Sequence, residues 1–358
     1  MARRNLEAAI RDLGSTRPTV RAEAIRDLVL HADEARERVL AALEGALRND
    51  ESGSVRAAAA VALADIQAVE ALSNLLLAME DDDPYVRQMA VSAVGELGDS
   101  RATARLLRAL TDPRPEIRFQ AVIAFPRIST DTAQAFEVLL EATRDEDPLV
   151  CHIALRMSEE LGSASPSSAS ASAERSSLDR RDLAPLDLPD ALMERTRTLL
   201  HHASGRVRTA AAVLLARCGE EVAIPVLVEA VEGKLAGADR EDEAAAIELC
   251  GELEVTAARP ALQRRAFGGV LGFGRDALYW HARVALARMG DPRAEQEILR
   301  ELRARDRDRR TLAVAAAGRA RLRSAEALLV SMRGDAGAAD PDAVEEAIAA
   351  LALDRRKG

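Results

Sequence analysis

Aromatic side chains are rare in this 358-residue chain: one Trp, two Tyr and five Phe make up 2% of it, whereas hydrophobic residues reach 48%. A core without aromatics has to be built from Ala, Leu, Val and Ile, and such packing favours closely spaced helices over sheet sandwiches. This hydrophobic content, together with 30% charged residues, is that of an ordinary folded protein and argues against wholesale disorder. The composition therefore predicts an all-α protein.

Cysteine is also scarce, and long apolar runs are missing. Cys151, Cys218 and Cys250 are widely separated and form no Cys-x-x-Cys pair, so we expect buried free thiols in a reducing compartment. No apolar run follows the N-terminal arginines, and the longest low-polarity runs, such as residues 57–64, are too short to span a bilayer. These features predict a cytoplasmic protein without a membrane segment.

The net charge is −10, which disfavours non-specific binding of nucleic acid by the whole chain. The charge is unevenly distributed. Residues 1–162 hold 19 Arg and 28 acidic residues, whereas residues 191–358 hold 27 basic and 26 acidic residues. The acidic excess therefore lies almost entirely in the first half of the chain.

One pattern recurs along the chain: an apolar residue followed by Arg opens a helical stripe, as in Val86-Arg87. With the Arg position as the anchor, the copies stand at Arg21, Arg56, Arg87, Arg118, Cys151, Arg208, Glu243, Tyr279, Arg310 and Val344. The intervals between them are 35, 31, 31, 33, 57, 35, 36, 31 and 34 residues. A period of this length is typical of a helical solenoid.

Each copy is predicted to contain two helices. Small residues stand three positions after the anchor: Ala24, Ala59, Ala90, Ala121, Ala154, Ala211, Ala246, Ala282 and Ala313. Ala at this position lets neighbouring helices approach closely, and a larger side chain would overpack the contact. Asp-Pro pairs at 83–84, 147–148 and 340–341 predict helix starts, because Asp caps free amides and Pro suits the first turn.

These residues resemble HEAT repeats, and more closely the short HEAT-like repeats of phycocyanobilin lyases, from about Asn5 to Asp354. The resemblance implies an α-solenoid, a right-handed superhelix of about ten helix pairs. In that family the first helix of each pair lies on the convex side, and the second lines a concave groove. The family's ladder between adjacent units implies a structural role for Asp83, Arg56, Arg87 and Arg118. Departures at Cys151, Glu243, Tyr279 and Val344 would break this ladder.

The interval of 57 residues contains a Ser/Ala-rich tract that begins at Gly162. Such a tract buries too little apolar surface to offset its ordering entropy. We therefore expect a disordered, flexible insertion at residues 163–190, between five N-terminal units in 1–162 and five C-terminal units in 191–358. A tolerated loop insertion and a hinge regulated by serine phosphorylation both remain open.

The five histidines form no catalytic or metal-binding motif. None of them is followed by Glu, as the dinuclear hydroxylases with HEAT repeats require, and the chain contains no HExxH, GxSxG or phosphate-loop motif. We therefore expect no cofactor and no metal, and the sequence leans against an enzyme without excluding one.

Half of the aromatic residues lie between 267 and 281, where four glycines precede the eighth anchor. The candidate partner-binding residues are Phe267, Phe273, Arg275, Tyr279, Trp280 and His281, with Phe119 and His152 at the position after other anchors. Exposed aromatics beside Arg dominate binding energy at interfaces. The alternative is that Tyr279 and Trp280 fill a gap left by an irregular repeat.

A second candidate binding site is a basic face. Residues 300–323 contain nine Arg and three acidic residues. The candidate basic face consists of Arg303, Arg305, Arg307, Arg309 and Arg310. Arg forks suit carboxylate or phosphate, although a solvated, salt-bridged surface would have the same composition.

Together these features favour a non-catalytic scaffold or adaptor that offers a groove to a protein partner of unknown identity. The first alternative is a bilin-lyase-like or chaperone-like protein that acts on a partner. Nucleic-acid binding through the arginines of 300–323 is less favoured, because the chain is acidic.

Overall fold

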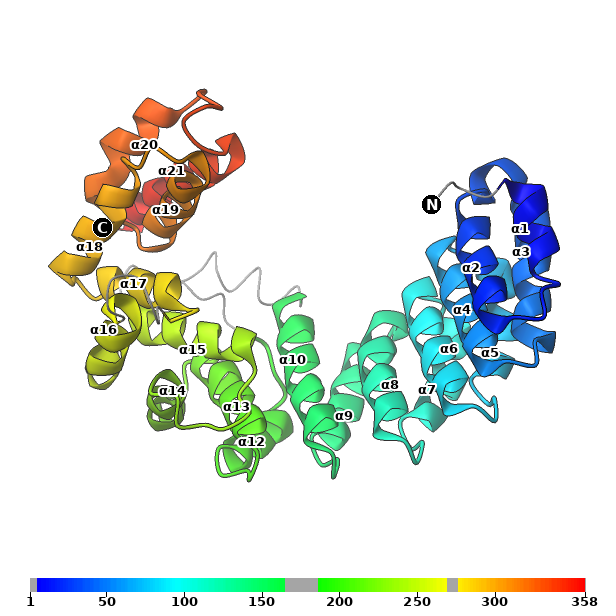
Figure 1. Ribbon diagram of the computed structural model, residues 1–358. Helices are drawn as coiled ribbons and strands as arrows, with labels where there is room; N and C mark the ends of the chain where they lie inside the picture. Colours follow the sequence, from blue (N-terminus) through cyan, green and yellow to red (C-terminus); the bar gives the residue numbers. More distant parts are fainter. Residues whose placement is uncertain (1–4, 165–185, 269–275, 358) are drawn as a thin grey trace. The chain divides into compact units, whose positions relative to one another are not determined.

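The computed structural model describes residues 5–164, 186–268 and 276–357 (Figure 1), and these residues form helices and turns without a strand. The chain divides into two compact units, Met1–Leu161 and Gly162–Gly358, which are described separately below. Most of the predicted insertion at 163–190 lies outside the described residues, so its disorder and the predicted three-part division stay predictions. None of the described helices is both long and apolar enough to cross a membrane.

In the first unit the helices alternate between two layers, called A and B here. The A helices are α1 (Leu6–Asp12), α3 (Ala32–Asn49), α5 (Leu72–Ala78), α7 (Thr103–Ala109) and α9 (Thr132–Ala142). The B helices are α2 (Pro18–Val29), α4 (Gly53–Asp65), α6 (Pro84–Leu97), α8 (Pro115–Ile128) and α10 (Pro148–Ala164). Short 3-10 turns, η1 (Val69–Ala71) and η2 (Ser100–Ala102), lead into α5 and α7. The helices α2, α4, α6 and α8 pack side by side in chain order (Figure 1).

The second unit repeats the arrangement. Its A helices are α12 (Asp190–Leu199), α14 (Ile224–Val231), α16 (Arg259–Phe267), α18 (Pro292–Glu301) and α20 (Glu326–Met332). Its B helices are α13 (Gly205–Arg217), α15 (Arg240–Glu252), α17 (Tyr279–Arg288), α19 (Arg307–Arg319) and α21 (Pro341–Lys357). The turns η3 (Glu221–Ala223), η4 (Thr256–Ala258) and η5 (Arg323–Ala325) precede α14, α16 and α20. The predicted all-α solenoid is confirmed, and the handedness of its superhelix stays a prediction.

Small residues hold the B helices together. All nine alanines three positions after the anchor are completely buried. Three glycines bring neighbouring B helices closer still: a Cβ on Gly95 would lie 2.5 Å from the Ala124 Cβ, and one on Gly251 would lie 2.5 Å from the Ala285 Cα. Gly318 approaches α21 in the same way. Because no Cβ fits at these glycines, the backbones themselves form the contact.

The Asp-Pro pairs begin helices as predicted. The Oδ1 atom of Asp83 accepts from the amide of Tyr85 (2.9 Å), and Asp147 and Asp340 cap α10 and α21 in the same way. Each aspartate satisfies an amide that the first turn of a helix leaves without an intrahelical partner.

All three cysteines are thiols outside any disulfide, and Cys151 and Cys250 are buried. Burial raises the pKa of the Cys250 thiol to about 12, so this thiol stays protonated near neutral pH. The expectation of burial is wrong for Cys218, which is half-buried because it lies at the C-terminal end of α13.

Candidate functional site

The anchor arginines of the first unit form a ladder. Each of the first four donates two hydrogen bonds to the aspartate in the turn before the next B helix. Nε and Nη2 of Arg56 donate to the Asp81 carboxylate at 2.8 and 2.7 Å, and the same two nitrogens of Arg118 donate to the Asp145 carboxylate at 2.7 Å each. The other rungs are Arg21–Asp50 and Arg87–Asp112. Two parallel N–H···O bonds to a carboxylate are among the strongest pairings between side chains.

Backbone carbonyls connect successive rungs. Arg56 also donates to the Asp50 carbonyl (2.8 Å), and Arg87 donates to the Asp81 carbonyl (2.9 Å). The carboxylate of Asp81 also accepts from the amide of Asp83 (2.9 Å). This amide orients Asp81 toward Arg56. The resemblance implied that Asp83 would pair with the anchor arginine, and this expectation is wrong, because the Asp83 carboxylate caps α6.

The anchors of the second unit are bonded differently. Where the anchor is Glu243, the charges are reversed, and its carboxylate pairs with Arg265 of α16. Arg310 has no carboxylate partner among the described residues and donates to backbone carbonyls. The bonding therefore differs both at Glu243, where the sequence departs from the repeat, and at Arg310, where it keeps the anchor Arg.

An aromatic cluster surrounds the buried Arg283 of α17. The Cζ atom of Arg283 lies 5.0 Å from the ring centroid of Tyr279, 5.4 Å from that of Trp280 and 5.9 Å from that of Phe267. The Tyr279 and Trp280 rings lie 5.6 Å apart. Arg283 is only 6% exposed, and its Nε donates to the Ala266 carbonyl at 3.3 Å. Cation–π contacts on three sides hold the guanidinium in place.

Tyr279, Trp280 and Arg283 line a cavity of about 350 Å³ together with Glu301, Arg309 and Leu312. We call this cavity the Trp280 pocket. Glu301 is buried, and its carboxylate accepts from Nε (2.9 Å) and Nη2 (2.7 Å) of Arg309. Leu312 is 54% exposed. The pocket thus joins part of the predicted aromatic site to one arginine of the predicted basic face.

Trp280 is half-buried and packs on the core formed by α17 to α21. Its Nε1 is buried and donates to no acceptor among the residues that the structure describes. A buried N–H without an acceptor costs about 1–3 kcal/mol. Trp280 therefore contributes both to the core and to the pocket wall.

The other arginines of the predicted basic face divide into two groups. Arg307 and Arg310 have structural roles: Arg307 donates to the Ala336 carbonyl (2.9 Å), and Arg310 to the carbonyls of Ala304 and Arg305 (2.8 Å each). Arg303 donates to the Leu299 carbonyl of the preceding helix α18 (3.2 Å), and Arg305 is exposed. Neither Arg303 nor Arg305 pairs with a carboxylate within the described ranges. These two arginines are therefore available to an anion.

The remaining candidate residues lie elsewhere. The His281 Nδ1 lies 2.5 Å from Glu248 Oε1, and Glu248 also pairs with Arg319. Burial lowers the pKa of His281, and the charge of Arg240 lowers it further. The half-buried Phe119 and the buried His152 belong to the first unit.

Phe273 and Arg275 lie outside the described residues. Within the described part of the chain, no three His, Cys, Asp or Glu side chains form a group that could hold a metal ion.

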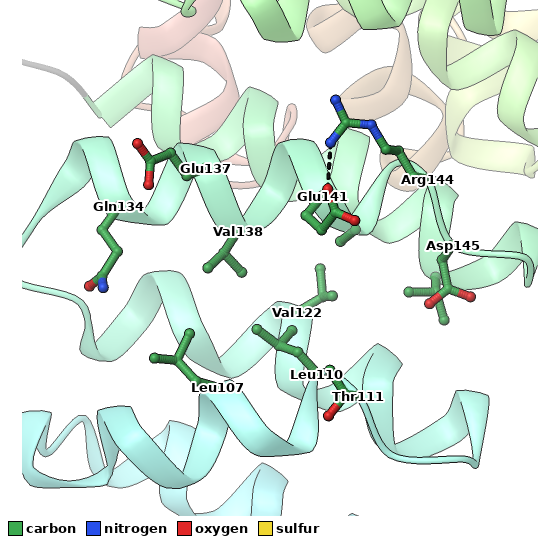
Figure 2. A pocket seen from close by; sticks show the side chains of 12 residues that line it. Leu107, Leu110, Thr111, Val122, Gln134, Glu137, Val138, Glu141, Arg144 and Asp145 are labelled. Atoms are coloured by element: carbon green, nitrogen blue, oxygen red, sulfur yellow. Dashed lines mark hydrogen bonds and ion pairs between the residues drawn. The ribbon is translucent and has the colours of Figure 1, made fainter.

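The structure also shows a groove that the sequence did not predict. Leu107, Leu110, Val122 and Val138 line the apolar part of a cavity of about 490 Å³ between α7, α8 and α9, and Glu137 and Glu141 stand along its α9 side (Figure 2). Helical periodicity shows which face of a helix is apolar, but not how far apart neighbouring A helices lie. No feature of the sequence indicates this spacing.

Comparison with known proteins agrees with this architecture. Residues 73–159 match the family model of HEAT repeats. These residues of the chain therefore consist of HEAT repeats. No curated protein matches its sequence significantly.

Solved structures with similar folds include YibA of Escherichia coli and importin beta. YibA is 16% identical, with a TM-score of 0.51 over 80% of this chain and 93% of YibA. Importin beta is 14% identical, with a TM-score of 0.53 over 97% of this chain and 50% of importin beta. The complex of CpcE and CpcF of phycocyanin lyase from Nostoc sp. PCC7120 is 18% identical, with a TM-score of 0.41 over 74% of this chain and 94% of that one. At these identities YibA and importin beta support the solenoid fold of this chain and nothing more specific.

Proposed function

We propose that this chain is a non-catalytic scaffold or adaptor that binds a protein partner at the Trp280 pocket. The observation that carries the proposal is the composition of the pocket wall. Trp, Tyr and Arg are the residues most often found at the energetic centres of protein interfaces, and here they surround a concave surface beside the exposed Leu312.

The charged side chains of the pocket are held in place before any partner binds. Glu301 fixes the fork of Arg309, and three aromatic rings fix Arg283. Side chains that are already ordered lose little conformational entropy on association. A cavity of about 350 Å³ is near the lower limit for small-molecule ligands, and it suits one or two anchoring side chains of a partner.

The proposal can be tested by affinity capture from the native cell lysate. We expect a partner that the wild type retains and that a Trp280→Ala/Leu312→Ala variant loses. The control is Val222→Ala/Val330→Ala, which removes two apolar side chains that lie in the same unit and are nearly as exposed as Leu312. Circular dichroism must show equal helicity in all three proteins. Equal capture by both variants would refute binding at this pocket.

A further inference from the structure

We infer that the partner presents an acidic segment, which lies across the turn between α18 and α19 and anchors in the adjacent Trp280 pocket. This inference rests on the proposed function and adds the chemistry of the partner. We call residues 302–306, which connect Glu301 of α18 to Arg307 of α19, the basic turn.

The first argument is charge. Residues 300–323 carry nine Arg against Glu301, Asp306 and Asp308, in a chain whose total charge is −10. Glu301 already pairs with Arg309, and Asp306 accepts from the amide of Arg309 as the cap of α19. Arg303 and Arg305 on the basic turn pair with no carboxylate of the described chain. A carboxylate brought by a partner would complete this arrangement.

The second argument is that the basic turn is fixed. Arg310 donates to the carbonyls of Ala304 and Arg305 on the turn and to the carbonyl of Gly337 (2.7 Å) in the turn before α21. The backbone that carries Arg303 and Arg305 is therefore tied to the neighbouring repeat. A fixed backbone lowers the entropy lost when their side chains bind an anion.

The third argument is proximity. Glu301 immediately precedes the basic turn, Arg309 is in the first turn of the helix that follows it, and both side chains line the Trp280 pocket. An extended segment bound along the turn would therefore reach Leu312 and Trp280. These two side chains would receive an apolar group of the same segment, and the arginines would receive its carboxylates.

An acidic peptide fits these observations better than nucleic acid does. Binding to a duplex backbone requires many cations along an extended track, whereas the arginines here that pair with no carboxylate of the described chain lie within one short segment, from Arg303 to Arg310. Asp306 and Asp308 interrupt the run of arginines, so this segment offers separate positions for single carboxylates and not a continuous track for a row of phosphates. A short carboxylate-bearing segment needs only the turn and the pocket.

The test uses the full chain and two readouts. The anisotropy of a fluorescein-labelled octaglutamate peptide reports binding, and the fluorescence of Trp280, the single Trp of the chain, reports the location. We expect a saturable rise in anisotropy and a change in Trp280 emission at low salt, both weakened at high salt. Labelled octalysine, which the acidic first unit attracts, should leave the emission of Trp280 unchanged. An octaglutamate titration without a rise in anisotropy would overturn the inference.

Charge reversal supplies the matched variants. We expect Arg303→Glu/Arg305→Glu to weaken octaglutamate binding by about tenfold or more. Arg17→Glu/Arg26→Glu makes the same charge change on exposed arginines of the first unit and should leave binding nearly unchanged. Equal weakening in both variants would attribute binding to net charge and overturn the inference. Tighter binding of a short DNA duplex than of octaglutamate would favour nucleic acid and overturn it as well.

This inference and the proposed function fail in different ways. If a partner is captured through Trp280 and Leu312 but is retained by Arg303→Glu/Arg305→Glu, the scaffold stands and its partner is not recognised through an acidic segment. If capture is the same with and without the pocket side chains, the proposed site itself is wrong.

Discussion

Replacement of Arg118 by Ala removes one complete rung of the arginine–aspartate ladder. Arg118 donates to both carboxylate oxygens of Asp145 at 2.7 Å and to the Asp112 carbonyl at 3.0 Å. The two side chains are only 10% and 12% exposed, so water replaces these bonds poorly. The substitution leaves the Asp145 carboxylate with the amide of Asp147 as its remaining partner (2.8 Å).

The expected cost follows from these contacts. A hydrogen bond to a charged group contributes about 1.5–3 kcal/mol, and removing one member of a well-buried ion pair costs about 3–5 kcal/mol. Because the pair keeps some exposure, we expect Arg118→Ala to lower the free energy of unfolding by about 2–4 kcal/mol. Arg118→Lys keeps the charge but cannot form the fork, and it should lose about half as much.

The assay is urea unfolding followed by circular dichroism, with the midpoint and slope fitted for each variant. Arg38→Ala is the control, because its ion pair with Glu7 is largely exposed (53% and 73%), and such pairs contribute little. If Arg118→Ala unfolds at the same urea concentration as the wild type, the ladder does not stabilise this unit and the reasoning is refuted.

The ladder also predicts a pH dependence. Burial alone would raise the pKa of Asp145, but the hydrogen bonds from Arg118 and the amide of Asp147 lower it below the ordinary value of an aspartate. A carboxyl whose pKa is lowered by folding stabilises the protein above its unfolded pKa of about 4, and this stabilisation is lost as the pH falls through the lowered value. The difference in stability between wild type and Arg118→Ala should therefore shrink at acid pH. A difference that does not change with pH would contradict the assigned role of Asp145.

Three further predictions concern packing and burial. Gly251→Ala places a Cβ 2.5 Å from a backbone atom of α17 and should lower the free energy of unfolding in urea by about 1–3 kcal/mol. The Cβ of Gly45→Ala meets nothing within 4 Å, so this variant should raise the free energy of unfolding by about 0.5–1 kcal/mol. A change of the same sign in both variants would contradict the assigned packing. Ala90→Leu should lower stability by about 1–3 kcal/mol through overpacking at a fully buried position, and an unchanged melting temperature would rule out the assigned core. Under native conditions a thiol reagent should label Cys218 faster than Cys250, because burial raises the pKa of Cys250 to about 12. Mass spectrometry of the labelled peptides measures the two rates. Faster labelling of Cys250 would contradict its assigned burial.

The repeat could be predicted because it depends on local periodicity. A fixed interval, a buried alanine and an Asp-Pro start are each visible in a single stretch of sequence, and the structure has all three. The acceptor of the ladder was assigned to Asp83 instead of Asp81, since both stand in the same turn. Only the turn geometry, in which the amide of Asp83 binds the Asp81 carboxylate, distinguishes them.

The candidate site was harder to predict, because it depends on contacts between repeats. The sequence marked an aromatic segment and an arginine-rich segment separately, and the structure brings Trp280 and Arg309 into one pocket wall. It also assigns Arg307 and Arg310 to backbone carbonyls, a role that residue type alone does not reveal. The groove lined by Leu107 and Val138 depends on the spacing of neighbouring A helices, which periodicity does not provide.

The most direct test of the proposed scaffold is site-specific photo-crosslinking in the native cell. A benzophenone amino acid would replace Leu312 on the Trp280 pocket or, as the control, Val222 on η3, which has nearly the same exposure (54% and 52%). We predict a discrete adduct with one partner protein from position 312 that is absent from position 222. No adduct at position 312, or the same adducts from both positions, would contradict the assignment of the Trp280 pocket as the partner-binding site.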